Sequence, residues 1–398
     1  MNSTSPTIIE SPGAVARPAV CPRIGIIGGG QLAKMTAVSA RQLGCDVSLI
    51  EKSADCPAAP LASTALTGDW NDPDELLKLA VVVDYLTLEN EFVDAHALAR
   101  LEDAGHALYP SSKSIGLVQD KLIQKQTLSA AGLPMPQFRS VTNRTEIETI
   151  AADFGWPLVL KARRNAYDGK GNATLNGVAD IDAAWDKLDG DNRDLYVEAF
   201  CPFTMELAIM VTRSRTGETA TYPVVESIQK DHICHIVRAP AAIPQELQDA
   251  ARDFAIRAVE AIDGTGTIGV EMFLTDNNEI LLNEMAPRVH NSGHYTIEAC
   301  DCSQFENHVR AVLGWPLGSS QMKTPAAVMV NLLGEGSGSG TPHGIDKALE
   351  IPGTHVHIYG KSESRPGRKM GHLTVTADDL GTAESLATRA AGLIQFGD

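Results

Sequence analysis

The segment EMFLTDNNEILLNEMAPRVHNSGH, residues 271–294, decides the fold more than any other stretch of the sequence. An Asp-Asn-Asn turn inside it separates two apolar runs, and this pattern predicts a hairpin of strands 268–273 and 279–283. Pairing of these strands places Glu271 beside Glu284. Neighbouring carboxylates supply the oxygen ligands that Mg²⁺ prefers, so the hairpin predicts a magnesium site. A pair of structural acids at the end of a sheet would give the same pattern.

The loop that follows the hairpin is rich in groups that bind oxyanions. It brings a guanidinium, two imidazoles, an amide and a hydroxyl close together: Arg288, His290, Asn291, Ser292 and His294. The two histidines have the spacing of a helical zinc pair, but the Asn-Ser-Gly between them disfavours a helix. The loop therefore predicts an anion-handling site rather than a zinc site.

Composition limits the classes of function open to the chain. Its 398 residues suggest two or three domains, and a net charge of -17 disfavours nucleic acid as a partner because a phosphate backbone needs a basic face. No apolar run is long enough to span a bilayer, so we expect no membrane partner. Residues 1–22 lack an apolar stretch behind a basic start and are expected to form a disordered extension. Without a secretory signal or a membrane span, the expected location is the cytoplasm. Seven scattered cysteines without a CxxC pair indicate reduced thiols.

The first structured part of the chain alternates strands with helices. An apolar strand at 23–27 runs into Gly28-Gly29-Gly30-Gln31, a helix follows, and a second strand ends at Glu51. The alternation continues to about residue 110 and predicts a doubly wound parallel sheet. The glycines and Glu51 also fit the dinucleotide fingerprint. A nicotinamide-dependent oxidoreductase is therefore one interpretation, and close packing of strand and helix is another.

Two further groups of cations are suited to phosphates. Lys161 ends an apolar strand and precedes the turn Tyr-Asp-Gly-Lys-Gly at 167–171, which either grips nucleotide phosphates or is a solvated hairpin turn. The Gly-Ser-rich segment at 334–340 predicts a flexible loop or linker. Beyond it, a Pro-Gly turn in this acidic chain is surrounded by cations that predict an anion site, with a solvated charge run as the alternative: Lys361, Arg365, Arg368 and Lys369.

Seven short strings along the chain resemble those of the ATP-grasp ligases, and within them the enzymes that carboxylate an aminoimidazole ribonucleotide in purine biosynthesis. The strings are GGGQL (28–32), ENE (89–91), QDK (119–121), YDGKG (167–171), NEMAPR (283–288), HNSGH (290–294) and RPGRKMGH (365–372). The last three together make the resemblance specific, and it extends from about residue 23 to 393.

The resemblance implies a fold of mixed α/β and α+β class with three domains. A pre-ATP-grasp doubly wound parallel sheet is expected at 23–110, an ATP-grasp domain at 111–323 and a small C-terminal β-rich domain at 324–398. Within the ATP-grasp domain, a lid subdomain is expected at about 137–199. The resemblance also implies a homodimer.

The reaction implied by the resemblance is the ATP- and Mg²⁺-dependent carboxylation of 5-aminoimidazole ribonucleotide by bicarbonate through carboxyphosphate, with Mn²⁺ as a substitute ion. The nucleotide would be held by Lys121, Lys161, Gly169, Lys170, Gly171, Glu198, Ala199 and Glu206, and the metal by Glu271 and Glu284. Bicarbonate would lie among Arg288, His290, Asn291 and Ser292. The ribonucleotide would face Gly30, Gln31, Glu89 or Glu91, Tyr167, Asp168, Lys361 and Arg368.

Three alternative functions remain open at the level of the sequence. A formate-dependent glycinamide ribonucleotide formyltransferase would share the ATP-grasp fold and the metal hairpin. A nicotinamide-dependent oxidoreductase would use the glycine loop but would leave Glu271 and Glu284 without a role. A nucleotide sensor without catalysis would bind ATP and show no turnover.

Overall fold

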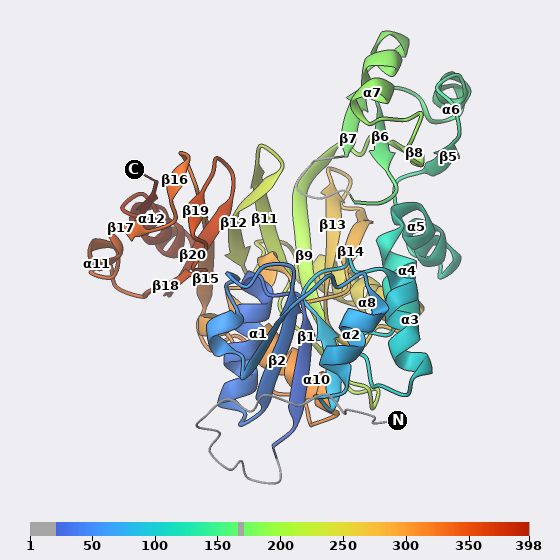
Figure 1. Ribbon diagram of the computed structural model, residues 1–398. Helices are drawn as coiled ribbons and strands as arrows, with labels where there is room; N and C mark the ends of the chain where they lie inside the picture. Colours follow the sequence, from blue (N-terminus) through green and yellow to red (C-terminus); the bar gives the residue numbers. More distant parts are fainter. Residues whose placement is uncertain (1–20, 166–170, 398) are drawn as a thin grey trace, which may run out of the picture.

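The computed structural model describes residues 21–165 and 171–397, and Figure 1 shows how their elements are arranged. The extension expected at 1–22 and the string at 167–171 therefore fall largely outside the described residues. The N-terminal part is a four-stranded sheet in the order β3-β2-β1-β4, and every pair in it is parallel. Its strands are β1 (Arg23–Ile27), β2 (Asp46–Glu51), β3 (Thr64–Thr67) and β4 (Tyr85–Leu88).

Helices cover both faces of this sheet, which confirms the prediction of a doubly wound parallel fold. α1 (Gln31–Gln42) and α10 (Gln304–Leu313) share one hydrophobic core with β1 and β2. α2 (Pro73–Ala80) and α3 (Ala95–Asp103) pack into a second core on the other face of the sheet. Ile27 of β1 and Ile50 of β2 point into this second core, because successive side chains of a strand point to opposite faces. Because α10 comes much later in the chain, it joins the N-terminal sheet to the rest of the molecule.

A smaller unit projects from the body of the molecule at the top of Figure 1. Its antiparallel sheet has the order β5-β8-β6-β7 and is made of β5 (Phe138–Val141), β6 (Leu158–Ala162), β7 (Asn172–Leu175) and β8 (Leu195–Ala199). α6 (Glu146–Phe154) and α7 (Ile181–Lys187) complete its own hydrophobic core. α4 (Ser112–Gln119) and α5 (Lys121–Ala130) lead into this unit from the N-terminal sheet.

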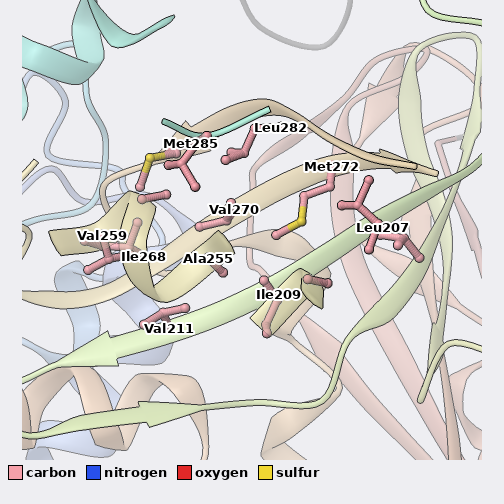
Figure 2. Close-up of a cluster of buried hydrophobic side chains, with 14 of the residues drawn as sticks. Leu207, Ile209, Val211, Ala255, Val259, Ile268, Val270, Met272, Leu282 and Met285 are labelled. Carbon is pink, nitrogen blue, oxygen red and sulfur yellow. The ribbon is translucent and has the colours of Figure 1, made fainter. Parts of the chain in front are cut away.

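The largest sheet has the order β14-β13-β9-β11-β12-β15-β20-β18, with β10 (Thr219–Thr221) paired to β9. Its first part contains β9 (Phe203–Arg213), β11 (Val225–Lys230), β12 (Ile233–Ala239), β13 (Gly266–Thr275) and β14 (Ile280–Ala286). Helix α8 (Gln245–Ala261) packs against it, and Figure 2 shows Ala255 and Val259 of this helix in one cluster of buried side chains with residues of the sheet, Val259 lying beside Ile268. This core supports the hairpin β13–β14 from one side.

The C-terminal residues extend the same sheet rather than forming a separate one. β15 (Ala326–Leu333) pairs with β12, β20 (Lys369–Ala377) pairs with β15, and β18 (Thr354–Ile358) pairs with β20. α12 (Leu380–Ala391) covers these strands together with α11 (Ile345–Ala348). Two small pairs complete this part: β16 (Gly338–Ser339) with β19 (Glu363–Ser364), and β17 (Pro342–His343) with β21 (Gln395–Phe396).

The Gly-Ser segment at 334–340 is anchored to the cationic turn, which corrects the expectation of a flexible linker. β16 pairs with β19, and the backbone N–H of Gly334 donates to the carbonyl of Arg368 at 2.9 Å. A Cβ on Gly340 would lie 1.8 Å from the carbonyl oxygen of Lys361. Gly340 is therefore needed because two backbones approach each other closely here, and the same holds for Gly334, where a Cβ would lie 2.5 Å from the carbonyl oxygen of Arg365.

Candidate active site

The β13–β14 hairpin places the two predicted metal ligands side by side. Glu271 and Glu284 are direct partners in the antiparallel register. Strand β14 continues to Ala286 instead of ending at residue 283, so Glu284 lies inside the strand and not just beyond it. A register shift directly after Glu271 locally disturbs the ladder. The hairpin predicted from the turn sequence is confirmed.

The two carboxylates carry opposite shifts in pKa. Burial raises the pKa of Glu271 to about 8, and the charges of Glu284 and Glu206 add to this effect. Burial also opposes the charged form of Glu284, but Lys121, whose Nζ lies 2.9 Å from Oε2 of Glu284, outweighs it and lowers that pKa. Negative charge is thus in excess around Glu271. An oxygen-only pair of this kind fits Mg²⁺, whose charge would relieve the repulsion.

Glu198 links buried Lys125 to half-buried Lys161 on the expected nucleotide side of the site. Nζ of Lys161 lies 2.8 Å from one carboxylate oxygen of Glu198, and Nζ of Lys125 lies 3.0 Å from the other. Burial raises the pKa of this carboxyl, but the two lysines overcome it and hold the pKa at about 2. Lys125 is absent from the sequence prediction. The only signal was its place one helical turn after Lys121, which does not by itself reveal burial.

Asp120 connects the start of α5 to the projecting unit. Its carboxylate accepts hydrogen bonds from Nε and Nη2 of Arg163 at 3.0 and 2.6 Å and also caps α5 through the N–H of Leu122 at 3.1 Å. The backbone N–H of Lys121 donates to the carbonyl of Arg163 at 2.8 Å. Lys121 is therefore held between Glu284 of the hairpin and the backbone of Arg163, which directly follows β6 of the projecting unit.

Arg288 is paired with a residue from the N-terminal part. Its Nε lies 2.5 Å from Oε2 of Glu91, and its Nη2 lies 3.0 Å from Oε1. Burial alone would raise the pKa of Glu91, but the guanidinium of Arg288 outweighs it and lowers the pKa. Glu91 follows β4, so this bidentate pair brings the loop after the hairpin to the carboxyl end of the N-terminal sheet.

His290 lies between this loop and the carboxylate hairpin. Its Nδ1 is 2.8 Å from the hydroxyl of Ser292, and its Nε2 is 3.6 Å from Oε1 of Glu271. Burial, together with the charges of Arg288 and Lys369, lowers the pKa of His290 to about 3. The imidazole is therefore neutral at physiological pH and can exchange hydrogen bonds with an oxyanion without adding a charge.

Asn291 forms hydrogen bonds with Asn331, a residue that the sequence did not predict to lie in the site. Its Nδ2 donates to Oδ1 of Asn331 at 2.9 Å, and Nδ2 of Asn331 donates to its Oδ1 at 2.6 Å. Asn331 lies in β15 and also donates to the carbonyl of Cys234 at 2.8 Å. This reciprocal pair uses one of the two N–H bonds of the Asn291 amide, so one remains for a ligand.

The glycine loop after β1 is occupied by carboxylates of the protein. The backbone N–H of Gly29 donates to Glu51 at 2.8 Å, and that of Ala33 donates to Glu89 at 2.9 Å. A Cβ on Gly30 would lie 2.4 Å from Oε1 of Glu89, so only glycine fits. The N–H groups that a dinucleotide phosphate would use are thus bound to anions, which disfavours the oxidoreductase alternative.

The cationic turn near the C-terminus contains a partly desolvated lysine. Nζ of Lys361 donates to the carbonyl of Lys369 at 2.7 Å and lies 5.7 Å from the ring centroid of Tyr359. Burial, and then the charge of Arg368, lowers the pKa of Lys361 to about 8. Arg368 itself donates to the carbonyl of Glu363 at 2.7 Å. Both predicted cations therefore lie on one braced turn.

Lys34 of α1 joins this turn to the N-terminal sheet. Its Nζ donates to the carbonyls of Ile358 and Tyr359 at 2.9 and 3.1 Å. Gln31 is the first residue of the same helix, so the N-terminal and C-terminal segments that carry predicted ribonucleotide contacts are in contact with each other. The sequence alone could not predict this role of Lys34, because its partners Ile358 and Tyr359 lie far away along the chain.

The other predicted residues are placed as follows. Glu206 lies in β9 opposite Phe273 of β13, and burial raises its pKa. Ala199 ends β8, next to Glu198. The carbonyl of Gly171 accepts the N–H of Ala162 at 2.8 Å. Tyr167, Asp168, Gly169 and Lys170 lie outside the described residues.

Two features that the described residues lack bear on the kind of site present. Among the described residues, no group of three or more His, Cys, Asp or Glu side chains is arranged to hold a metal ion. Magnesium at Glu271 and Glu284 would therefore need oxygens from phosphate and water to complete its shell. Across residues 21–165 and 171–397, no helix is long and apolar enough to cross a membrane.

Three family models match consecutive parts of the chain. The ribonucleotide synthetase preATP-grasp domain matches residues 22–119, and the ATP-grasp domain matches residues 126–305. The phosphoribosylaminoimidazole carboxylase C-terminal domain matches residues 327–386. Together with the fold and the site, these matches define an ATP-grasp ligase.

Comparison with individual relatives shows which group of ATP-grasp ligases the chain resembles. The chain is 42% identical over 362 residues to the N5-carboxyaminoimidazole ribonucleotide synthase of Synechococcus elongatus, covering 91% of each. It matches the structure of N5-carboxyaminoimidazole ribonucleotide synthetase from Thermotoga maritima with a TM-score of 0.86 and 40% identity, covering 95% of this chain and 99% of that one. The synthase of Aspergillus clavatus in complex with ADP and 5-aminoimidazole ribonucleotide matches with a TM-score of 0.86 and 34% identity, covering 94% and 98%. The chain belongs to the family of N5-carboxyaminoimidazole ribonucleotide synthases.

Proposed function

We propose that the protein uses ATP and Mg²⁺ to carboxylate 5-aminoimidazole ribonucleotide with bicarbonate, releasing ADP and phosphate. One observation supports this proposal more strongly than any other. The carboxylate pair of the hairpin and the oxyanion loop meet in a single cluster, where Nε2 of His290 lies 3.6 Å from Oε1 of Glu271. Such a site can align a nucleotide phosphate with a small oxyanion, which phosphoryl transfer to bicarbonate requires.

The roles proposed for the residues follow from their charges. Lys121 and Lys161 bind phosphate oxygens of ATP, and Glu198 with Lys125 orients Lys161. Glu271 and Glu284 would hold magnesium, which would supply charge neutralisation at these phosphates. The remaining assigned nucleotide contacts, namely Gly169, Lys170, Gly171, Ala199 and Glu206, are part of the same proposal.

The loop after the hairpin is proposed to hold bicarbonate and then carboxyphosphate. Arg288 provides a fixed positive charge, and neutral His290 provides a hydrogen-bonding group that is already desolvated. A bicarbonate oxygen takes the γ-phosphoryl group from ATP, and ADP leaves. The amine nitrogen of the ribonucleotide then attacks the carboxyl carbon, loses a proton, and phosphate departs with the electron pair of the C–O bond.

The ribonucleotide is proposed to lie between the glycine loop and the cationic turn. Lys361 and Arg368 would bind its phosphate, because both cations are braced by backbone carbonyls and not free on a solvated face. Gly30, Gln31, Glu89, Tyr167 and Asp168 are proposed to contact the rest of the substrate, and Glu91 to act through Arg288.

Two further parts of the proposal concern the state of the protein. All seven cysteines are free thiols, which suits a reducing compartment such as the cytoplasm. A homodimer is proposed on the family resemblance, and sedimentation of the purified protein measures it. Mn²⁺ is proposed as a substitute for Mg²⁺ because it also accepts oxygen ligands.

The test is an assay of ADP formation with bicarbonate, with and without 5-aminoimidazole ribonucleotide and Mg²⁺. We expect turnover only when all components are present. Formate incorporation into glycinamide ribonucleotide in place of carboxylation would favour the formyltransferase. Thermal stabilisation by Mg-ATP without any turnover would favour the sensor, and stabilisation by NADH would favour the oxidoreductase.

A further inference from the structure

The side chain of Gln304 clamps the backbone of His290. Gln304 is the first residue of α10 and is 0% exposed. Its Oε1 accepts the backbone N–H of His290 at 2.9 Å, and its Nε2 donates to the backbone carbonyl of the same residue at 2.8 Å. A single amide thus bonds both backbone groups of a loop residue that has no strand partner for them, and the carbonyl also accepts the backbone N–H of Gly293 at 3.0 Å.

The backbone groups of His290 fix the orientation of this amide, and His294 accepts a further hydrogen bond from it. Nε2 of Gln304 is 3.1 Å from Nδ1 of His294, and an amide nitrogen can only donate, so Nδ1 is the acceptor. The neutral ring therefore carries its proton on Nε2. The ring is wedged between Phe305 and His372, with centroid distances of 5.5 and 4.8 Å. Because the ring is packed between these two neighbours, its Nδ1 stays next to the amide nitrogen of Gln304.

Two further contacts connect the same glutamine to the loop. A Cβ on Gly293 would lie 2.6 Å from Oε1 of Gln304, so this position must be glycine for the clamp to close. The backbone N–H of Gln304 donates to the hydroxyl of Thr296 at 3.0 Å, and that hydroxyl donates to the carbonyl of Gly293 at 2.6 Å. The start of α10 and the loop are therefore built as one unit.

We infer that Gln304 is a positioning residue for the carboxylation step, which acts by holding His290 where it meets bicarbonate. This inference rests on the proposed function. Gln304 contacts the backbone of His290 and not the expected position of the reacting atoms. The ring of His290 has a 2.8 Å contact to Ser292 on one side and Glu271 at 3.6 Å on the other. A small shift of the backbone would move the imidazole out of this narrow space.

A matched pair of substitutions separates positioning from stability. Gln304→Glu keeps the shape of the side chain but removes both donors and places a carboxylate against the carbonyl of His290. Asn307→Asp makes the same amide-to-acid change one turn later on α10. Asn307 is also 0% exposed, and it bonds to Tyr222 at 2.9 Å and to Gly318 at 2.7 and 3.1 Å, none of which belongs to the site.

We expect kcat for carboxylation to fall about a hundredfold in Gln304→Glu, because a misplaced group in an aligned site costs about that much. The Michaelis constant for Mg-ATP should stay near the wild-type value. Asn307→Asp should lower the melting temperature while its kcat remains near wild type. In a His290→Ala background, Gln304→Glu should cause little further loss, because the residue acts through His290.

Several results would overturn the inference without touching the proposed function. They are wild-type kcat in Gln304→Glu, an equal loss of kcat in Asn307→Asp, or a full additional loss in the His290→Ala background. A readout that does not need turnover is the nitrogen-15 spectrum of labelled histidines. The His290 ring signal, assigned by His290→Ala, should move in Gln304→Glu and stay in place in Asn307→Asp. An unmoved signal contradicts the clamp even if the wild type carboxylates nothing.

Discussion

At the scale of single residues, burial and neighbouring charges shift the pKa values of the ionisable groups in the site. Glu271 has its pKa raised to about 8 by burial and by neighbouring carboxylates, whereas Lys121 holds Glu284 in the charged form. Lys361 has its pKa lowered to about 8 by burial. Glu271 and Lys361 therefore have pKa values close to physiological pH, and the charge of a bound metal ion or phosphate would shift their protonation, which is the behaviour expected of a ligand site.

Substitution of Glu284 should abolish turnover without unfolding the protein. Glu284→Ala removes one of the two carboxylates proposed to bind Mg²⁺, so we expect kcat to fall by roughly a hundredfold or more. The measurement is steady-state ADP formation at saturating Mg²⁺, with the melting temperature recorded alongside. Glu279→Ala, which changes an exposed glutamate just before β14, is the control and should keep wild-type activity. Equal activity of the two variants would make the hairpin carboxylates merely structural.

The pH dependence of ribonucleotide use should report Lys361. A lysine carries its charge below its pKa, so the ammonium is present below pH 8 and is lost as the pH rises through about 8. We therefore expect kcat/KM for the ribonucleotide to fall above pH 8, because this ratio follows the ionisation of the free enzyme. Lys361→Arg, which stays charged, should shift this fall to higher pH. A fall at the same pH in the arginine variant would assign it to another group.

At the scale of elements, helix starts and strand ends position the functional groups. α5 begins at Asp120, which caps it and is paired with Arg163 of the projecting unit. α10 begins at Gln304, and β14 carries Glu284 two residues before it ends at Ala286. The projecting unit therefore connects to the body through an ion pair next to Lys121, besides the covalent chain.

Loss of Asp120 should destabilise the fold more than loss of an ordinary helix cap. Asp120→Ala removes a cap and leaves Arg163 without its buried partner, at a cost of about 3–5 kcal/mol. Asp94→Ala removes only the exposed cap of α3, whose carboxylate accepts the N–H of His96 at 2.8 Å, at a cost of about 1 kcal/mol. Urea unfolding of both variants measures the difference. Equal losses would mean that the Asp120–Arg163 pair contributes nothing beyond the cap.

The sequence predicts elements and local motifs well because their signals are local. The turn at 275–278 predicted the hairpin, and with it the pairing of Glu271 and Glu284. The anchors of the site could not be predicted in this way. Lys125, Asn331 and Gln304 act through burial and through partners far along the chain, and neither property leaves a mark on a single sequence. The resemblance to ATP-grasp ligases gave the remaining residues their expected roles.

At the scale of the whole molecule, the site is assembled from distant parts of one chain. Glu91 from the N-terminal part binds Arg288, and Asn331 from the C-terminal strands binds Asn291. Lys34 of α1 holds the turn that precedes Lys361. Because β15, β20 and β18 extend the same sheet that carries the hairpin, the predicted C-terminal domain is structurally continuous with the ATP-binding part. We therefore expect no separate fragment to be active.

The central claim is that this site phosphorylates bicarbonate and passes its carboxyl group to the ribonucleotide amine. The most direct test supplies bicarbonate labelled in carbon and in oxygen, together with Mg-ATP and 5-aminoimidazole ribonucleotide, and follows both labels by mass spectrometry. We expect the carbon label in the carboxylated ribonucleotide and one bicarbonate oxygen in the released phosphate at each turnover, because the oxygen that takes the phosphoryl group leaves with it. Phosphate without labelled oxygen, or a ribonucleotide without labelled carbon while ADP accumulates, would contradict the account.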